Sequence, residues 1–393
     1  MHGMRMRKAT SALVGLLLAG VAATPAQAET VRSTQWHLDA MKADDIWSIS
    51  TGKDVTVAVI DTGVKRIPEL EGQVLPGKNF ASASYTGDER TDHSHHGTAI
   101  AAVIAGNGKG PGGADSAFGL APGAKILPLR VDFGGDGTAP FRSMIQAIRF
   151  AADSDAKILN VSMGGINQSD DLDSAVKYAL GKGKLIFASV GNDGNEGVIW
   201  PAATPGVVGV GAVDAKGGPT KESQHNRYVD IVAPGKDIVS GCDGGTGLCN
   251  SSGTSEATAL ASASAALLWS VHPDWTNNQI LRVLLNTAGK PKDGAQRNDY
   301  VGYGVVRPRI AVPTPGDPGP ADVYPLPDLA AAASPSPAPG GKAAPAPGKS
   351  APQAQAKKDD TGSALPWIAL GLGACLIIGG AVTAVVIQQR SRR

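Results

Sequence analysis

Consecutive aliphatic and β-branched residues recur along most of the chain, and stretches with helical periodicity separate them. Such runs predict strands covered on both faces, because a half-exposed strand would alternate apolar with polar residues. The predicted strands span residues 55–60, 125–131, 157–162, 184–190 and 207–213. The predicted helices span residues 97–105, 141–153, 172–181, 257–271 and 277–286. This alternation indicates an α/β fold with a mainly parallel central sheet flanked by helices on both faces.

The two ends of the chain differ in composition from this part. Basic residues, a short apolar run and small residues predict a secretory signal peptide at residues 1–28. Residues 365–387 are apolar and uncharged over a length that crosses a bilayer, and the arginines after them predict a cytoplasmic tail at 388–393. Pro, Ala, Gly and Ser dominate residues 312–364, which is typical of a linker. One folded domain is therefore expected at residues 29–311.

The composition argues against some partners. The chain has 36 basic and 35 acidic side chains, a formal net charge of +1 and no central Lys/Arg-rich block, so nucleic acid is not expected to bind. Of the 3 cysteines, Cys242 and Cys249 flank a short glycine-rich loop, and we expect a structural disulfide between them in an oxidising compartment. Cys375 lies inside the predicted span. No motif implies a cofactor.

Polar residues follow three of the predicted strands at their carboxyl ends, where ligands bind in parallel α/β sheets. They are Asp61, Ser162 and Asn192. Asp61 by itself indicates little, because an aspartate at the end of a strand is more often a turn or capping residue.

Two further segments place reactive side chains at the start of predicted helices. His93, His95 and His96 precede a helix of small residues. Three histidines so close together also suggest a metal site, but no second His/Cys cluster has ligand spacing, so no metal is expected. Ser255 opens an alanine-rich helix, where a hydroxyl is ordinarily an N-cap. The order Asp, His, Ser along the chain changes this interpretation, because it is the order of the subtilisin triad.

Three motifs in this order resemble those of the subtilase family. They are Asp61-Thr62-Gly63 after a buried strand, His96-Gly97-Thr98 before the small-residue helix, and Gly253-Thr254-Ser255. Residues 160–165 and 190–192 also resemble the family's substrate-lining strand and oxyanion loop, so the resemblance extends over most of residues 54–309. It implies a subtilisin-like fold with Asp61, His96 and Ser255 as the triad, Asn192 as an oxyanion donor, and Ser162 and Gly164 as substrate-backbone ligands.

Within this family, the order of signal peptide, catalytic domain, Pro-rich linker and span is similar to the mycosins, membrane-anchored proteases associated with type VII secretion. The stretch between the expected cleavage point and Asp61 is too short for a folded inhibitory propeptide, so we expect residues 29–47 to wrap the domain. Glu256 departs from the family pattern, because an apolar residue usually follows the nucleophile. We expect it either to raise the pKa of His96 or to reshape a subsite.

The sequence thus predicts a single-pass membrane protein with an extracellular serine endopeptidase domain that cleaves protein or peptide substrates linked to type VII secretion. Two alternatives remain open: a catalytically silent subtilase that stabilises a secretion complex, and a serine esterase. No calcium site can be identified from spacing, although many subtilases bind calcium. With His96 as the general base, activity is expected to rise with pH through an apparent pKa near ~6.5, the reference value for imidazole.

Overall fold

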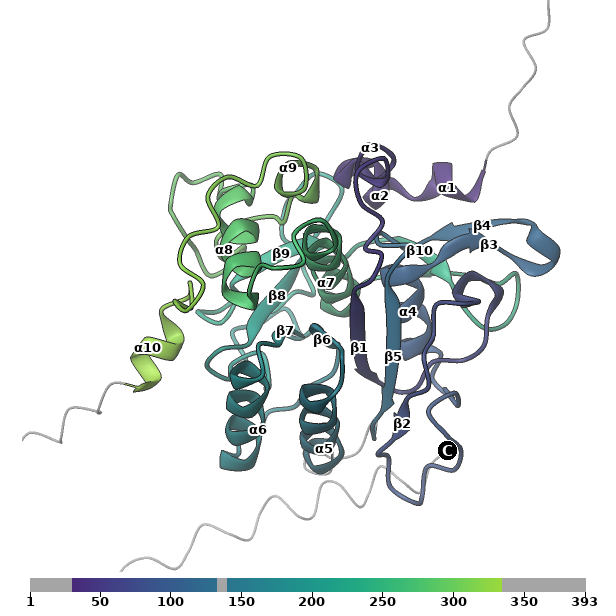
Figure 1. Cartoon of the computed structure of the whole chain (residues 1–393), viewed down its shortest axis with the longest axis horizontal. Coiled ribbons are helices and arrows are strands. Elements are labelled where there is room, and N and C mark those ends of the chain that lie inside the picture. The colour runs from purple at the N-terminus through teal and green to yellow at the C-terminus, as the bar shows by residue number, and fades with distance from the viewer. Residues whose placement is uncertain (1–29, 133–139, 334–393) are drawn as a thin grey trace, which may run out of the picture. The chain divides into compact units, whose positions relative to one another are not determined.

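A seven-stranded sheet lies at the centre of the computed structural model, which describes residues 30–132 and 140–333 (Figure 1). The strand order is β2-β5-β1-β6-β7-β8-β9, and every neighbouring pair is parallel. The strands are β2 (Lys78–Asn79), β5 (Lys125–Arg130), β1 (Thr56–Asp61), β6 (Ile158–Val161), β7 (Leu185–Ser189), β8 (Val208–Val213) and β9 (Ile231–Pro234). The predicted parallel α/β fold is confirmed.

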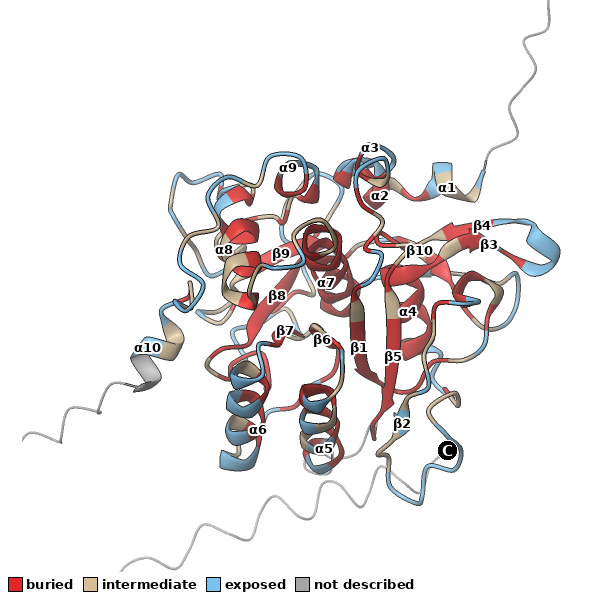
Figure 2. Cartoon of the chain, in the orientation of Figure 1, coloured by how far each residue is buried: buried red, intermediate tan, exposed pale blue. Residues whose placement is uncertain are grey.

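Helices cover both faces of this sheet because its strands are apolar on both. Val57 and Val59 of β1 pack in one core cluster with α4 (His96–Ala105), α7 (Thr254–Val271) and α8 (Asn277–Thr287). Ala58 and Ile60 of the same strand pack in a second cluster with α5 (Pro140–Asp153) and α6 (Asp170–Gly181). Figure 2 shows both buried layers, with the exposed positions of α5 and α6 turned outward.

Short elements complete the described part of the chain. Two small antiparallel sheets join β3 to β4 and β10 to β11. These elements are α1 (Val31–Thr34), α2 (Trp36–Met41), α3 (Ala43–Trp47), η1 (Pro68–Leu70), β3 (Asn107–Lys109), η2 (Pro111–Gly113), β4 (Asp115–Phe118), β10 (Ile238–Gly241), β11 (Leu248–Ser251), α9 (Pro308–Ala311) and α10 (Asp328–Ala333).

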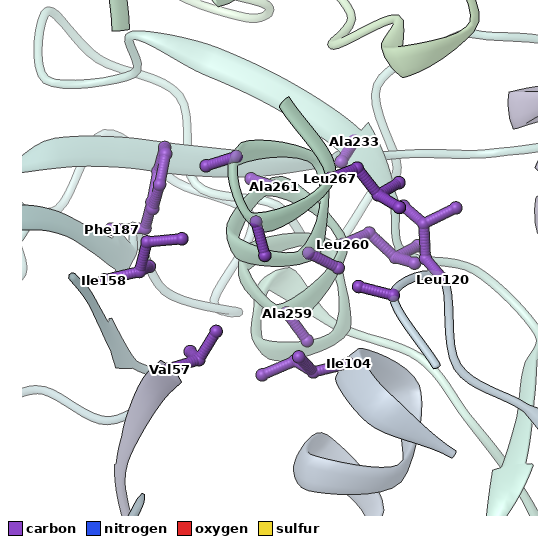
Figure 3. Packing of buried hydrophobic residues seen from close by; sticks show 14 of the residues in the cluster. Val57, Ile104, Leu120, Ile158, Phe187, Ala233, Ala259, Leu260, Ala261 and Leu267 are labelled. Atoms are coloured by element: carbon purple, nitrogen blue, oxygen red, sulfur yellow. The ribbon is translucent and has the colours of Figure 1, made fainter. Parts of the chain in front are cut away.

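Helix α7 is the central packing element of the first core cluster. Every residue from Thr254 to Trp269 is buried, and the many alanines let neighbouring elements approach the helix closely. Figure 3 shows side chains of the sheet, of α4 and of the adjoining loop surrounding it. The helix begins at Thr254, three residues before the predicted start, so that Ser255 lies in its first turn.

The N-terminal segment packs along the domain, as its short length predicts. The side chain of Gln35 donates to the carbonyl oxygens of Phe118 (2.8 Å) and Val239 (2.9 Å) and accepts from the Phe118 N–H (3.0 Å). Leu38 and Ile46 add fully buried side chains to the first core cluster. This segment therefore connects β4 to β10 on the surface of the domain.

The folded part extends beyond the predicted boundary at residue 311. Val312 and Leu326 are 4% and 3% exposed and belong to the first core cluster. The Arg282 guanidinium donates to the carbonyl oxygens of Pro318 (2.7 Å) and Pro320 (2.9 Å) and contacts that of Val323. The linker prediction is therefore wrong for residues 312–330, because an arginine satisfies the carbonyls of a proline-rich segment that also buries apolar side chains.

The other terminal predictions concern residues that the structure does not describe. These are the signal peptide at 1–28, the rest of the predicted linker up to 364, the span at 365–387 and the tail at 388–393. Among residues 30–132 and 140–333, no helix combines the length and the apolar character that crossing a bilayer requires.

The packing of residues 312–330 generates a stability prediction. Replacing Leu326 by Ala should lower the free energy of unfolding by about 2–4 kcal/mol, because it leaves a cavity in the core. Urea denaturation followed by circular dichroism measures this change. The control is Val323→Ala, at a side chain that is 51% exposed, which should change stability by less than ~0.5 kcal/mol. Equal stabilities of the two variants would contradict the packing described above.

Candidate active site

The predicted catalytic residues come from three separate elements that meet at the carboxyl edge of the sheet. Asp61 is the last residue of β1 and is fully buried. His96 is the first residue of α4, and Ser255 lies in the first turn of α7. The structure therefore brings together side chains that are far apart in the sequence.

Asp61 holds one nitrogen of the His96 ring. Its Oδ1 lies 2.7 Å from His96 Nδ1 and also accepts from the Thr62 backbone N–H at 2.8 Å. Helix α4 approaches β1 closely because position 97 is glycine: a Cβ there would lie 2.2 Å from the Gly63 carbonyl oxygen. The contact between Asp61 Oδ1 and His96 Nδ1 fixes the orientation of the ring, and the other ring nitrogen, Nε2, faces away from Asp61.

Asp92 is a supporting residue that the sequence analysis missed. It is fully buried, and its Oδ2 accepts from the backbone N–H (2.9 Å) and the hydroxyl (2.6 Å) of Thr98 in α4. Its Oδ1 accepts from the hydroxyl of Thr62, next to Asp61, at 2.8 Å. Burial works against the charged carboxylate, but these hydrogen bonds and one from Ser94 hold the pKa of Asp92 below its ordinary value. Asp92 comes shortly before the start of α4, where an aspartate often accepts hydrogen bonds from the helix, and this position could have identified it from the sequence.

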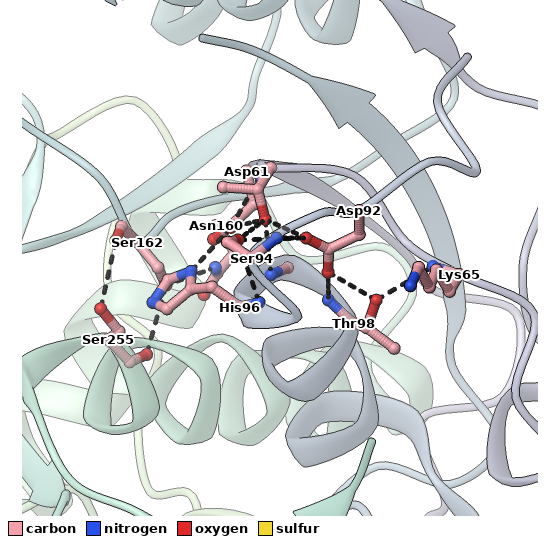
Figure 4. A network of polar contacts seen from close by, with 11 residues as sticks. Asp61, Lys65, Asp92, Ser94, His96, Thr98, Asn160, Ser162 and Ser255 are labelled. Atoms are coloured by element: carbon pink, nitrogen blue, oxygen red, sulfur yellow. Dashed lines mark hydrogen bonds and ion pairs between the residues drawn. The ribbon is translucent and has the colours of Figure 1, made fainter. Parts of the chain in front are cut away.

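The Ser255 hydroxyl faces the His96 ring (Figure 4). It also lies 3.1 Å from the carbonyl oxygen of Ser162, and the Ser162 hydroxyl donates in return to the Ser255 carbonyl at 3.2 Å. Ser255 is only 7% exposed. The alcohol, the imidazole and the carboxylate follow one another in space, with the imidazole in the middle. This is the arrangement that activates a nucleophile.

A second buried network connects β6 to α7. Asn160 Nδ2 donates to the Ser162 hydroxyl (2.9 Å), and Asn160 Oδ1 accepts from the Ser262 hydroxyl (3.0 Å). All three residues are buried. This network fixes the helix that carries Ser255 against the strand that leads to Ser162.

Asn192 follows β7 and contacts the start of α7. Its Oδ1 accepts from the Thr254 backbone N–H (2.8 Å) and the Thr254 hydroxyl (3.0 Å). Because the carbonyl end of this amide is occupied, the NH₂ end is oriented as a donor. The Ser255 N–H lies in the first turn of α7, where backbone donors have no partner within the helix. Both candidate donors therefore belong to the start of α7 or to a residue that contacts it.

Ser162 and Gly164 lie in the segment that follows β6. Gly164 is exposed, and a Cβ there would lie 2.5 Å from the Trp200 carbonyl oxygen. The next residue, Gly165, pairs with Trp200 in both directions, at 3.0 and 2.8 Å. The segment is thus held on its inner side, while the backbone at Gly164 is open to an added strand.

The charges around His96 change its protonation. Burial alone would lower its pKa, but the Asp61 carboxylate, its hydrogen bond, and the charges of Glu256 and Asp92 together raise the pKa of His96 to about 9. The expectation of ~6.5 is therefore corrected, since that reference value contains no neighbouring carboxylates. The suggestion that Glu256 raises the pKa of His96 agrees with this direction.

The two cysteines close a hairpin next to the site. Cys242 and Cys249 form a disulfide between the adjacent ends of β10 and β11, as the sequence predicts. Asp243 in this hairpin pairs with Lys65 and lies 3.6 Å from Nδ1 of His95, the residue before His96. The hairpin thus contacts the segment that holds the imidazole, and β11 leads directly to Ser255.

Among the described residues, no group of three or more His, Cys, Asp or Glu is arranged to hold a metal ion. A cavity of about 720 Å³ lies elsewhere, between Trp36 and Met41 of α2 and residues such as Pro234 and Tyr300. None of the predicted catalytic residues lines it. The candidate site is therefore the group of polar side chains around His96 and Ser255.

The comparisons with known proteins agree with this geometry. A model of the subtilase family, peptidase family S8, matches residues 52–304. The thermophilic serine proteinase of Bacillus sp. (strain AK1) is 36% identical over 250 residues, which cover 63% of this chain and 60% of that protein. The chain thus spans less than two thirds of that relative. Subtilisin BL of Lederbergia lenta is 34% identical over 259 residues, which cover 65% of this chain and 92% of the subtilisin.

Two solved structures of mycosins are similar over a larger share of the chain. MycP1 from Mycobacterium smegmatis has a TM-score of 0.65 and 28% identity, covering 76% of this chain and 89% of that one. The MycP3 protease from the type VII (ESX-3) secretion system has a TM-score of 0.64 and 29% identity, covering 73% and 90%. The fold and the site define a serine endopeptidase of the subtilisin type. The chain belongs to the subtilase family, and its fold is similar to that of the mycosins.

The carboxylates around His96 generate a prediction that does not depend on catalysis. In a ¹H–¹⁵N NMR titration, the His96 ring should titrate near pH 9, and Glu256→Gln should lower its pKa because one negative charge that favours imidazolium is removed. The control is Glu222→Gln, since Glu222 already pairs with Lys236 at 3.3 Å. An unchanged His96 pKa in Glu256→Gln would contradict this assignment.

Proposed function

We propose that this subtilase is a membrane-anchored, extracytoplasmic serine endopeptidase in which Asp61, His96 and Ser255 form the catalytic triad. The observation that carries the proposal is the 2.7 Å contact between Asp61 and His96, with the Ser255 hydroxyl facing the same ring. Protein or peptide chains are the substrates.

In the proposed reaction, His96 accepts the Ser255 proton while the hydroxyl oxygen attacks the peptide carbonyl. The same ring then protonates the leaving amine, which releases one peptide and leaves an acyl group on Ser255. Water repeats the sequence and hydrolyses this ester. Asp61 keeps the ring oriented and stabilises the imidazolium that forms in each half of the reaction.

The oxyanion is bound by the side-chain NH₂ of Asn192 and the backbone N–H of Ser255. Both donors are fixed before the reaction, the first by Thr254 and the second by the helix start. Donors that are already oriented stabilise charge on the oxygen without further rearrangement. Ser162 and Gly164 bind the substrate backbone as an added strand, so that recognition tolerates varied side chains.

The cellular setting is inferred from the sequence and from the relatives. The predicted signal peptide and span support a catalytic domain outside the cytoplasm that is attached to the membrane. The similar MycP1 and MycP3 proteases belong to type VII secretion systems, which supports a role in processing proteins of such a system. Anchoring keeps a protease concentrated beside membrane-bound partners.

Labelling with a serine-reactive phosphonate tests the nucleophile. The unmodified protein should become labelled, and Ser255→Ala should abolish the label because it removes the attacking oxygen. Ser252→Ala is the matched control, three residues earlier, and should retain labelling. Absence of label in both the unmodified and the Ser255→Ala protein would instead support the silent, complex-stabilising subtilase. Cleavage of esters without cleavage of peptides would identify an esterase.

The proposed oxyanion donor has a kinetic signature. Asn192→Ala should lower kcat by a factor of ~10²–10³ with little change in KM, because the oxyanion exists only after attack. Steady-state hydrolysis of a fluorogenic peptide measures both constants. A change confined to KM would assign Asn192 to substrate binding alone.

The raised pKa of His96 sets the expected pH dependence of activity. A general base must be neutral, so kcat/KM should rise with pH through a value well above 6.5, toward the pKa of about 9. At two units below that pKa, roughly one ring in a hundred is neutral. The measurement is kcat/KM against pH with a peptide that has no titrating groups. A profile that is already flat at pH 6 would contradict His96 as the base in this environment.

The physiological substrate can be found by comparing secreted proteins. Cells that carry the Ser255→Ala protein should accumulate the uncleaved form of the substrate, while the membrane complex is still present. Mass spectrometry of culture supernatants identifies that protein and its cleavage site. Identical supernatants from both strains would argue against a processing role.

A further inference from the structure

Glu256 is a buried carboxylate next to the nucleophile. Its side chain is only 5% exposed, and the structure gives it no hydrogen bond and no ion pair with any described residue. Its oxygens are not among the completely buried polar atoms of the described residues that lack a partner, so the carboxylate retains some access to solvent. Burying a charged group in such a position costs free energy unless another group forms a hydrogen bond or an ion pair with it.

Glu256 is near the proposed oxyanion donor, Asn192, and its charge affects the proposed general base, His96. Its Oε2 lies 3.1 Å from the point that a Cβ on Gly253 would occupy, and the Asn192 amide nitrogen lies 3.2 Å from the same point. Its charge also acts on His96. The carboxylate therefore lies close to the oxyanion donor, and its charge reaches the ring that protonates the leaving amine.

Neither the helix nor nearby cations account for this carboxylate. The N-terminus of α7 favours a negative charge, but that field supplies no hydrogen-bond donor to the side chain. Two lysines of the described loops already have carboxylate partners: Lys236 pairs with Glu222, and Lys65 pairs with Asp243. When His96 is neutral, as its role as general base requires, no ion pair joins Glu256 to a lysine or arginine of the described residues, and a cationic substrate side chain would supply that partner.

We propose that Glu256 selects substrates with a lysine or arginine immediately after the scissile bond. This inference rests on the proposed function, because it assigns the leaving-group side of the same cleft. A cationic side chain there would approach a carboxylate that is partly shielded from water, where an ion pair is stronger than at an open surface. In the proposed function, the backbone at Ser162 and Gly164 binds the part of the substrate before the scissile bond. That part does not supply the positive charge for Glu256.

The selection is coupled to the general base. A bound cation offsets the negative charge of Glu256 and repels a proton on His96, so it lowers the pKa of the ring in the complex. Substrates with the cation should therefore reach their maximal rate at a lower pH than neutral substrates. A carboxylate that only stabilised the fold would not produce this dependence on the substrate.

The experiment uses the full-length protein in detergent. A peptide mixture is digested, the cleaved bonds are mapped by mass spectrometry, and the best peptide is resynthesised with Lys, norleucine or Glu after the scissile bond. Norleucine matches the lysine side chain closely in length without its charge. We expect kcat/KM to be about tenfold higher for Lys than for norleucine, lowest for Glu, and the Lys preference to weaken in high salt.

Two variants separate charge from structure. In Glu256→Gln, kcat/KM for the Lys peptide should be within about twofold of kcat/KM for the norleucine peptide. The difference between the pH profiles of the two peptides should also disappear. Glu222→Gln should retain both, since its carboxylate is already paired with Lys236. If Glu256→Gln does not fold, the salt dependence and the pH profiles of the unmodified protein still decide.

The outcomes distinguish this inference from the proposed function. Equal kcat/KM for the three peptides, with labelling at Ser255 intact, overturns the selection and leaves the endopeptidase in place. A Lys preference that persists in Glu256→Gln, or that follows a Lys placed before the scissile bond, assigns recognition to other residues and also overturns it. No cleavage of any peptide and no labelling at Ser255 overturn both proposals.

Discussion

The contact between the Asp61 carboxylate and the His96 ring is the constraint on which the rest of the site depends. It joins the end of a central strand to the start of α4, and it can form only where these two elements approach closely. The absence of a side chain at Gly97 permits that approach, and Asp92 holds Thr62 and Thr98 on either side of it. A fully buried carboxylate would be unfavourable alone, so the imidazole and the Thr62 N–H are part of what allows Asp61 to be there.

Much of this arrangement could be predicted from sequence because its determinants are local. Uninterrupted apolar runs identify the five inner strands of the central sheet, and small residues identify α4 and α7. The order of the three motifs then indicates the triad. Residues whose partners are distant in the sequence gave no comparable signal: Asn160 contacts Ser262 across the core, and Asp92 is recognisable only once Thr62 and Thr98 are beside it. β2 and β9, the two edge strands that were not predicted, form because neighbouring strands offer open edges.

The correction to the His96 pKa has the same origin. A motif specifies which residues are present, whereas a pKa depends on every charge within several ångströms and on the water that has been excluded. Asp61, Glu256 and Asp92 come from three different segments, and their charges act on one ring. Composition fails in a similar way for residues 312–330, where proline and glycine suggest an unfolded segment but Arg282 supplies the missing hydrogen bonds.

The docking of residues 312–330 changes how far the protease could work from a membrane. With the proposed span at 365–387, a chain that left the domain at residue 311 would have about 53 residues of reach, or roughly 170 Å at full extension. Since the described fold continues to residue 333, about 31 residues remain, and the limit falls to roughly 100 Å. Under this anchoring, the catalytic domain would stay closer to the bilayer. Its accessible substrates would be proteins that emerge within that shorter distance of the membrane.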